Sequence, residues 1–356
     1  MNILIDIGHP AHIHYFKNCA RILSKKGHQF LFVVRERNST IELAQATGFN
    51  YISRGKGKVG LINKLIGIPQ VDYILYKSAR QFKPNLFLSF SSPYAAHVAW
   101  LMRKPHIAFD DTEHAVFEHW MCRPFTDVVL SPSCYNAKLW KNQMLFDSLM
   151  ELCYLHPNYF QPDSSVLKKI GVQEGEPFVV LRLISWDANH DVGQKGLSYQ
   201  NKVKLVEELS KDCRVFISSE TELSPSLKKY QLTIHPQDLH SILYYASLYV
   251  GEGGTTASES VVLGTPAIYI NSLNAGLFEE EEKRGLLYHL TRFDDILKTS
   301  HSILNDSNHK RTFKCNWEKL IADKIDPTAF MVWFIDNYPE SKTIMKNNPD
   351  YQYTFK

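Results

Sequence analysis

Glycines interrupt an apolar pattern in one stretch, residues 249–272, which reads YVGEGGTTASESVVLGTPAIYINS and also contains Glu252 and Glu259. An apolar strand is expected up to Val250 and a helix from Thr255, with glycines breaking the pattern between them. Backbone N–H groups of such a turn and the positive helix end can face an anion. A carboxylate about one helical turn further along can accept hydrogen bonds from sugar hydroxyls. We therefore predict a site for a nucleotide diphosphate and its ribose, made by Gly251, Glu252, Gly253, Gly254, Thr255, Thr256 and Glu259. The alternative is an ordinary turn whose glycines only permit tight packing.

Three histidines, His9, His12 and His14, follow the first apolar stretch, near an expected helix start. Histidine titrates near neutral pH, so His12 could act as a general base on a sugar hydroxyl, with His9 and His14 in an acceptor site. We expect no metal here because no carboxylate stands at a familiar ligand spacing. The structural alternative is that the histidines only cap and pack.

A second dense polar group, DDTEHAVFEHW at 110–120, follows another expected strand. Titratable groups gathered at one place can have pKa values suited to acid–base work. We predict catalytic or substrate-binding roles for Asp111, Glu113, His114 and Glu118. Two alternatives stay open: a divalent cation held by Asp110, Asp111 and Glu113, or acidic residues that only favour a helix N-terminus.

Alternating strands and helices must position these groups. Strands are expected at 2–7, 28–34, 50–52, 85–90, 106–109 and 125–131, the last of the first half, with helices at 11–26, 40–48 and 94–102. The second half repeats this alternation. The pattern predicts an α/β fold with parallel sheets, in which ligands bind at the carboxyl ends of the strands.

The length of 356 residues is typical of two domains. Pro157 and Pro162 lie in a segment without periodicity, so the hinge is expected there. The predicted division is an acceptor domain at 1–157, a nucleotide-sugar domain at 158–330, and a helix at 331–356 that returns to the first domain and ends in a mobile tail.

Composition excludes several classes of protein. A formal net charge of +3 is too small to indicate a nucleic-acid partner, and six scattered cysteines without a C-x-x-C pair are typical of reduced thiols. No stretch approaches the roughly 20 apolar residues of a membrane span, so a cytoplasmic protein is expected. The segment 51–84 mixes aliphatic side chains with Arg54, Lys56, Lys58, Lys64, Lys77, Arg80 and Lys83. It could contact an anionic membrane surface or a lipid-linked acceptor, or be a helix with a solvated basic face.

Two motifs resemble known families. The glycines, Thr255, Thr256 and Glu259, followed by LGTPA at 263–267, resemble the donor-nucleotide segment of GT-B glycosyltransferases, especially of the MurG type, and of UDP-GlcNAc 2-epimerases. The opening IDIGHPAHIHYF and the sequence FDDTEHA resemble, from residue 1 to about 335, the family known as domain of unknown function 354.

The resemblance implies a GT-B fold with two Rossmann-like domains facing a cleft. It implies that Arg182, Ser185 and His190 lie near the donor phosphates, with Asn271, Asn274 and Glu279 as further donor contacts. The implied reaction moves a sugar from a nucleotide-sugar donor, UDP-linked by this resemblance, to a hydroxyl acceptor in surface polysaccharide or lipid-linked glycan synthesis. His12, or else Asp111 or Glu113, takes the acceptor proton, and neither metal nor another cofactor is required.

Two other functions remain. A UDP-sugar 2-epimerase would use the same donor site and move protons with Glu113 and Glu118, although Ser91-Ser92-Pro93 lacks the aspartate expected there. The other is a non-catalytic nucleotide-sugar binding protein.

Overall fold

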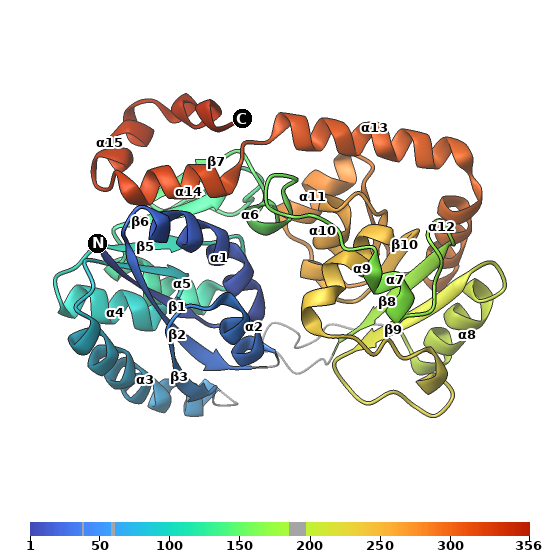
Figure 1. Ribbon diagram of the computed structural model, residues 1–356, viewed down its shortest axis with the longest axis horizontal. Coiled ribbons are helices and arrows are strands. Elements are labelled where there is room, and N and C mark those ends of the chain that lie inside the picture. The colour runs from blue at the N-terminus through green and yellow to red at the C-terminus, as the bar shows by residue number, and fades with distance from the viewer. Residues whose placement is uncertain (38, 58–60, 185–196) are drawn as a thin grey trace. The chain divides into compact units, whose positions relative to one another are not determined.

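Two parallel sheets form the framework of the chain, one in each of two compact units (Figure 1). The computed structural model describes all residues except 38, 58–60 and 185–196. Unit 1 comprises Met1–Tyr154 and Lys324–Lys356, and unit 2 comprises Leu155–Asp323. The chain thus returns to unit 1 at Lys324, whereas the sequence predicted a return at residue 331. The predicted α/β class with parallel sheets is confirmed.

Unit 1 has a seven-stranded sheet in the order β3-β2-β1-β4-β5-β6-β7. Its strands are β1 Asn2–Ile7, β2 Gln29–Glu36, β3 Tyr51–Lys56, β4 Leu86–Phe90, β5 His106–Phe109, β6 Val128–Pro132 and β7 Gln143–Phe146. All neighbouring pairs are parallel. The strands are apolar along nearly their whole length because helices cover both faces of such a sheet.

The helices of unit 1 are α1 Pro10–Lys25, α2 Thr40–Thr47, α3 Leu61–Phe82, α4 Pro93–Leu101, α5 Val116–Cys122, α14 Pro327–Asp336 and α15 Glu340–Asn347, with α6 Leu152–Leu155 at the junction of the units. Short 3-10 helices occur at Arg123–Phe125 and Pro349–Phe355. The strand order reverses direction between β1 and β4, and such a switch point is the usual place for a ligand in an open α/β sheet.

Two sequence predictions about the helices and strands of unit 1 were wrong. The strand expected to be last is followed by β7, whose four residues QMLF are too short to show a strand pattern. The expected mobile tail is instead a 3-10 helix that packs on the unit. The ring of Tyr351 lies 4.7 Å from that of Trp333, and buried Gln352 accepts a hydrogen bond from the Asp147 N–H at 2.5 Å. Such contacts with distant residues leave no local trace in the sequence.

Unit 2 has a five-stranded parallel sheet in the order β12-β11-β10-β8-β9. Its strands are β8 Phe178–Leu183, β9 Arg214–Ser219, β10 Leu248–Gly251, β11 Ala267–Tyr269 and β12 Leu287–His289. Its helices are α7 Ser165–Lys169, α8 Tyr199–Leu209, α9 Leu239–Tyr245, α10 Gly254–Val262, α11 Gly276–Lys283, α12 Phe293–Asn305 and α13 Ser307–Asp323, with 3-10 helices at Lys228–Tyr230 and Pro236–Asp238. The order reverses between β8 and β10, so the glycine turn that follows β10 lies at the switch point of this sheet.

Candidate functional site

The glycine turn of unit 2 connects β10 to α10, as the sequence predicted. A Cβ atom on Gly251 would lie 2.5 Å from the Tyr249 hydroxyl oxygen and 2.8 Å from Cβ of Arg182, and one on Gly254 would lie 2.6 Å from Cζ of Phe278, so a larger residue at either position would force its neighbours to move. Gly253 precedes the helix and no described side chain caps it; the Ala257 N–H donates to the Gly253 carbonyl at 3.1 Å. The N–H groups of the first turn therefore remain available to an anion.

The carboxylate of Glu259 is held in place by a histidine. Nε2 of His240, on α9, lies 3.0 Å from Oε1 of Glu259, and both side chains are buried. Because of this contact the carboxylate has a defined orientation on α10, beside the glycine turn. His240 was not among the predicted site residues, since nothing in the spacing of these two residues indicates that they meet.

Glu252 is engaged within unit 2. It accepts hydrogen bonds from the N–H groups of Ile184 and Leu197, at 3.3 and 3.1 Å, and its Oε1 lies 3.0 Å from Nζ of Lys202. The buried carboxylate thereby ties the turn to the residues that flank 185–196. Ser185 and His190 lie outside the described residues.

Arg182, at the end of β8, lies against the glycine turn. Its Cγ is 3.5 Å from the position of a Cβ atom on Gly253. Its guanidinium donates to Oγ of Ser218 at 2.6 Å and to Oε1 of Glu220 at 3.0 Å, so its charge is shared with a carboxylate of the same unit. The arginine is therefore near the turn but already paired.

The loop after β11 also reaches the turn. Nδ2 of Asn271 donates to the Glu252 carbonyl at 3.3 Å, and Nδ2 of Asn274 donates to Oε1 of Glu279 at 3.1 Å. Asn271 is buried, whereas Asn274 is exposed. Of these two, Asn271 is the one that touches the predicted nucleotide-binding segment.

The three histidines of the segment after β1 are divided among different tasks. Nδ1 of His9 accepts from the Ala11 N–H at 3.3 Å and caps α1, and the ring of His14 stacks on Tyr154 at 5.0 Å. The ring of His12 lies over the end of β4, 4.7 Å from the ring of Phe90, and its Nδ1 accepts from the Gly8 N–H at 3.3 Å. Burial, followed by the nearby charges of His9 and Arg54, lowers the pKa of His12 well below its ordinary value. The ring is therefore neutral near pH 7, and its proton is on Nε2.

The acidic group after β5 holds a carboxyl with a strongly altered pKa. Asp110 is buried and its Oδ2 lies 2.7 Å from Nε2 of His119 and 2.8 Å from Nη2 of Arg123. Burial, with repulsion from Asp110 next to it, raises the pKa of Asp111 to about 7, although Thr112 donates a hydrogen bond to it at 3.0 Å. A carboxyl that titrates near neutral pH can both take and return a proton under physiological conditions.

The other residues predicted around Asp111 differ in their surroundings. Oε1 of Glu113 accepts from the Asn136 N–H at 3.0 Å, and His114 is half-buried. Glu118, on α5, lines a cavity on the same unit. Across the described ranges, no group of three or more His, Cys, Asp or Glu side chains could hold a metal ion.

A buried ion pair in unit 1 was missed from the sequence. Asp6 is fully buried in β1. Its Oδ1 lies 2.8 Å from Nε of Arg54 on β3, and its Oδ2 accepts a hydrogen bond from Oγ of Ser92 at 2.5 Å. The signal was the single charged residue in the apolar strand ILIDI. Assigning Arg54 to an exposed basic segment was wrong, because the pairing with Asp6 takes it out of solvent.

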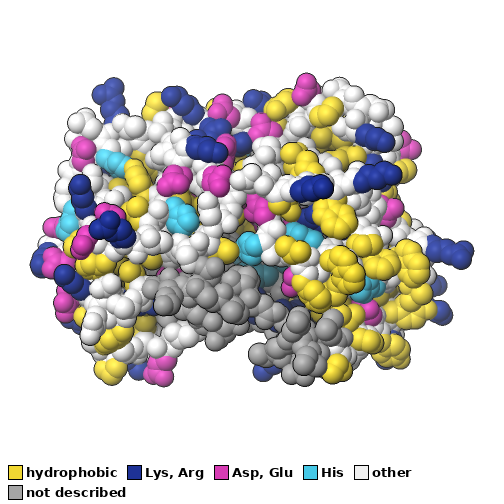
Figure 2. Space-filling model, turned by 180° about the vertical axis from the view of Figure 1, so that it is seen from behind, with side chains coloured by type: hydrophobic (Ala, Val, Ile, Leu, Met, Phe, Trp, Pro, Cys, Tyr) yellow, Lys and Arg dark blue, Asp and Glu magenta, His cyan; other side chains and the backbone are white. Residues whose placement is uncertain are grey.

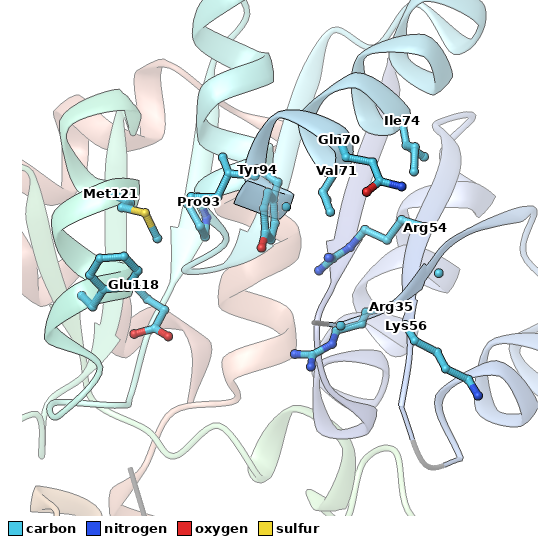
Figure 3. Close-up of a pocket in the computed structure, with 15 residues that line it drawn as sticks. Arg35, Arg54, Lys56, Gln70, Val71, Ile74, Pro93, Tyr94, Glu118 and Met121 are labelled. Atoms are coloured by element: carbon cyan, nitrogen blue, oxygen red, sulfur yellow. The ribbon is translucent and has the colours of Figure 1, made fainter. Parts of the chain in front are cut away.

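This ion pair adjoins both His12 and the cavity. A Cβ atom on Gly8 would lie 3.7 Å from Cε1 of His12 and 3.8 Å from Nη2 of Arg54. The cavity, of about 300 Å³, is formed by the ends of β2 and β3 together with parts of α3, α4 and α5 (Figure 3). The guanidinium of Arg54 lies 4.8 Å from the ring centre of Tyr94 in its wall.

The two parallel sheets of seven and five strands define a GT-B fold, and solved structures of that class match almost the whole chain. UDP-GlcNAc 2-epimerase from Neisseria meningitidis, bound to UDP-GlcNAc, is 10% identical, with a TM-score of 0.63 over 96% of this chain and 99% of that chain. A spinosyn rhamnosyltransferase complexed with spinosyn aglycone is 12% identical, with a TM-score of 0.64 over 95% and 100%. At such identities the likeness shows the fold.

The chain belongs to the family described as protein of unknown function, DUF354, whose model matches residues 1–331. An uncharacterized protein of Methanocaldococcus jannaschii is 25% identical over 283 residues, which are 75% of this chain and 81% of that protein. The predicted fold and the predicted family are both confirmed. None of the helices in the described parts of the chain is long and apolar enough to cross a membrane.

Proposed function

We propose that this protein is a glycosyltransferase that moves a sugar from a nucleoside-diphosphate sugar, UDP-linked, to a hydroxyl group of a glycan or lipid-linked acceptor. The observation that carries the proposal is the N-terminus of α10, which no side chain of the described residues caps, which glycines line and which the buried Glu259 flanks. Proteins of similar fold support it: one is bound to UDP-GlcNAc and another, a glycosyltransferase, is in complex with DTDP.

On the donor side, the first-turn N–H groups of α10 would stabilise the negative charge of the departing diphosphate. Arg182 would contribute through the N–H groups of its guanidinium that do not donate to Ser218 or Glu220. Glu259, oriented by His240, would accept hydrogen bonds from the ribose hydroxyls. Stabilising the diphosphate in this way needs no metal ion, because the helix end and its amide groups already carry positive potential.

On the acceptor side, the acceptor oxygen would form a bond to the anomeric carbon while the bond from that carbon to the phosphate oxygen breaks. The proton of the acceptor hydroxyl would pass to the carboxylate of Asp111, whose pKa of about 7 suits a general base. His12 would instead donate a hydrogen bond from Nε2, since its Nδ1 already accepts one from Gly8.

A 2-epimerase is the second candidate. In its favour, Asp111 and Glu118 are carboxyl groups that could move a proton at a sugar carbon, and the pKa of Asp111 is suited to that task. Against it, Ser92 occupies the loop where an aspartate is expected, and the nearest carboxylate, Asp6, is paired with Arg54. A paired, buried carboxylate is a poor base, so the transferase is preferred.

We further propose that unit 1 contacts a membrane surface peripherally, as a lipid-linked acceptor would require. Large apolar side chains gather on one part of the surface in Figure 2, over neighbouring helices α3, α4 and α5; the exposed ones are Ile66, Tyr73, Trp100, Leu101, Val116 and Trp120. Exposed Lys77, Arg80, Arg103 and Lys104 belong to α3 and to the turn after α4. Aromatic and basic side chains in one area favour the boundary of an anionic bilayer.

The donor site is tested first by thermal shift with nucleoside diphosphates and nucleotide sugars, because a ligand that binds only the folded state raises Tm. We expect UDP to stabilise the protein and E259A to abolish the effect. E259Q keeps a partner for His240 and reports on charge alone, and E207A, at an exposed glutamate of unit 2, is the matched control. Absence of a shift with every nucleotide tested would remove the basis of the proposal.

The reaction is then tested by incubation with UDP sugars in D₂O. A transferase releases UDP only when an acceptor fraction is added, whereas a 2-epimerase exchanges the proton at C2 of the sugar without any acceptor. Deuterium at C2 in the absence of acceptor would therefore exclude the transferase in favour of the second candidate. Binding with neither outcome would indicate a nucleotide-sugar binding protein.

A further inference from the structure

We infer that the cavity of unit 1 is a subsite for a phosphate group on the acceptor, held chiefly by Arg35 and Arg54. This inference rests on the proposed function and specifies its acceptor class. The lining includes three cationic side chains, Arg35, Arg54 and Lys56, and one carboxylate, Glu118. A volume of about 300 Å³ is enough for a phosphate together with part of the sugar or lipid that bears it.

The two guanidinium groups are directed into the same space. Figure 3 shows Arg35 and Arg54 reaching from the strand ends toward Tyr94 and the side of the cavity that carries Glu118, whereas Lys56 points away from them. Two arginines around one space can bind phosphate oxygens with several parallel N–H bonds, a geometry that a lysine cannot reproduce. Gln70 and Tyr94, which also line the cavity, can donate to the remaining oxygens.

Arg35 is the residue to which a bound anion would supply a counter-charge. Arg54 already has Asp6 as a counter-charge, but Arg35 has no hydrogen bond or ion pair with any residue of the described chain, and its Nε is shielded from solvent without an acceptor. Partial burial, together with the like charges of Arg37 and Arg54, lowers the pKa of Arg35. Holding a cation here without a counter-charge from the described residues costs free energy, which a bound anion would offset.

The chain around Arg35 is shaped to leave its guanidinium in place. Gly55 and Gly57 enclose Lys56 after β3, and Gly55 has a φ of +79°, which favours glycine. A Cβ atom on Gly57 would overlap the guanidinium of Arg35. The glycine at 57 therefore gives Arg35 the room to lie over the turn and to face the cavity.

The cavity also adjoins a group assigned to the acceptor. Arg54 and His12 both border Gly8, so a ligand whose phosphate is bound by Arg54 would have room to extend toward the ring of His12. The neutral ring would donate to a phosphate oxygen or to the sugar next to it. A phosphate here would thus position the acceptor hydroxyl near the carboxyl ends of β1 and β4, where ligands of such sheets bind.

The test is calorimetric titration of the full-length protein with glucose 1-phosphate, with the neutral methyl glucoside as the comparison ligand. R35Q is expected to weaken binding about ten-fold or more, as expected for the loss of a charge-assisted contact. R21Q, which removes an exposed arginine of α1, should bind like the wild type. G57A retains every charge but displaces Arg35, and should also weaken binding.

Two sources of the phosphate are separated by a second arm. Sedimentation with vesicles of phosphatidylcholine alone, or mixed with phosphatidic acid, tests a lipid phosphate, whereas glucose 1-phosphate tests a soluble one. An R35Q effect in either arm supports the inference and names the source. Equal binding by R35Q and the wild type in both arms overturns it, as does wild-type binding of neither probe.

The inference and the proposed function fail separately. Loss of UDP binding in the thermal-shift assay would refute the donor site and leave the phosphate result untouched. A wild type that binds UDP but shows no Arg35-dependent phosphate binding would keep the donor site and remove this subsite. Tm of R35Q and G57A, measured without ligand, shows whether either variant fails to fold.

Discussion

Replacing Glu281 by glutamine should make the stability of unit 2 less dependent on pH. Glu281, on α11, is fully buried against α10; Oγ of Ser258 donates to its Oε1 at 2.5 Å, and its Oε2 has no hydrogen-bond partner in the described chain. Burial raises the pKa of this carboxyl from its ordinary 4.5 to about 8. The folded protein therefore keeps a proton that the unfolded chain has lost.

The sign and size of the effect follow from that difference. Between the ordinary pKa of 4.5 and about 8, unfolding releases the proton of Glu281, so the free energy of unfolding falls as pH rises and then becomes level. Each pH unit of this interval corresponds to about 1.4 kcal/mol, which totals roughly 5 kcal/mol as an upper bound. E281Q cannot ionise, and so it should escape this loss.

The assay is urea unfolding followed by far-UV circular dichroism at several pH values from acid to mildly alkaline. The difference in unfolding free energy between E281Q and the wild type should grow in favour of E281Q as pH rises. E282Q, at an exposed glutamate of the same helix, is the matched control and should show no such growth. A difference that stays constant across this range would refute the argument that Glu281 is protonated in the folded protein.

Three further predictions concern the candidate sites. The wild-type turnover number should fall as pH drops below about 7, where Asp111 becomes protonated. D111N should lower the turnover number by roughly 10²–10⁴-fold with little change in UDP affinity. A D111N enzyme with the wild-type pH profile would exclude Asp111 as the base. D6N should destabilise the protein by about 3–5 kcal/mol in urea unfolding, because Arg54 is left buried without a counter-charge, and D6N/R54M should recover part of that loss; equal stability of D6N and wild type would contradict the pairing. G254A should lower the free energy of unfolding by about 1–3 kcal/mol and weaken UDP binding in calorimetry, because its Cβ meets Phe278. Adding F278L to G254A should relieve both effects. A G254A variant with wild-type stability and UDP affinity would show that the turn has more room than the structure indicates.

The parts of the candidate sites that could be predicted are those encoded by neighbouring residues. The glycines at 251–254 interrupt an apolar strand just before a helix, and the structure has that turn between β10 and α10. His9, His12 and Asp111 were expected after strand ends, and they follow β1 and β5. These predictions succeeded because strand periodicity, and its interruption by glycines at turns, can be recognised over a few residues.

What could not be predicted depends on residues that are far apart in the chain. Asp6 and Arg54 are 48 positions apart, and neither position indicates that the two side chains pair. His240 and Glu259 belong to different helices, as do Ser258 and Glu281. Arg35 was overlooked because a single arginine at a strand end is unremarkable until the cavity around it is known.

The amino-acid pattern was enough to predict the alternation of strands and helices, the two parallel sheets, the glycine turn and membership of the family. All of these follow from the order of residue types along short stretches, or from short sequence motifs. The folded arrangement was needed to see which charges are paired, which carboxyl groups keep a proton near neutral pH, and that the C-terminal residues pack on unit 1. The reason is physical: solvation and Coulomb interaction depend on distances across the fold, and those distances exist only after the sheets and helices have packed.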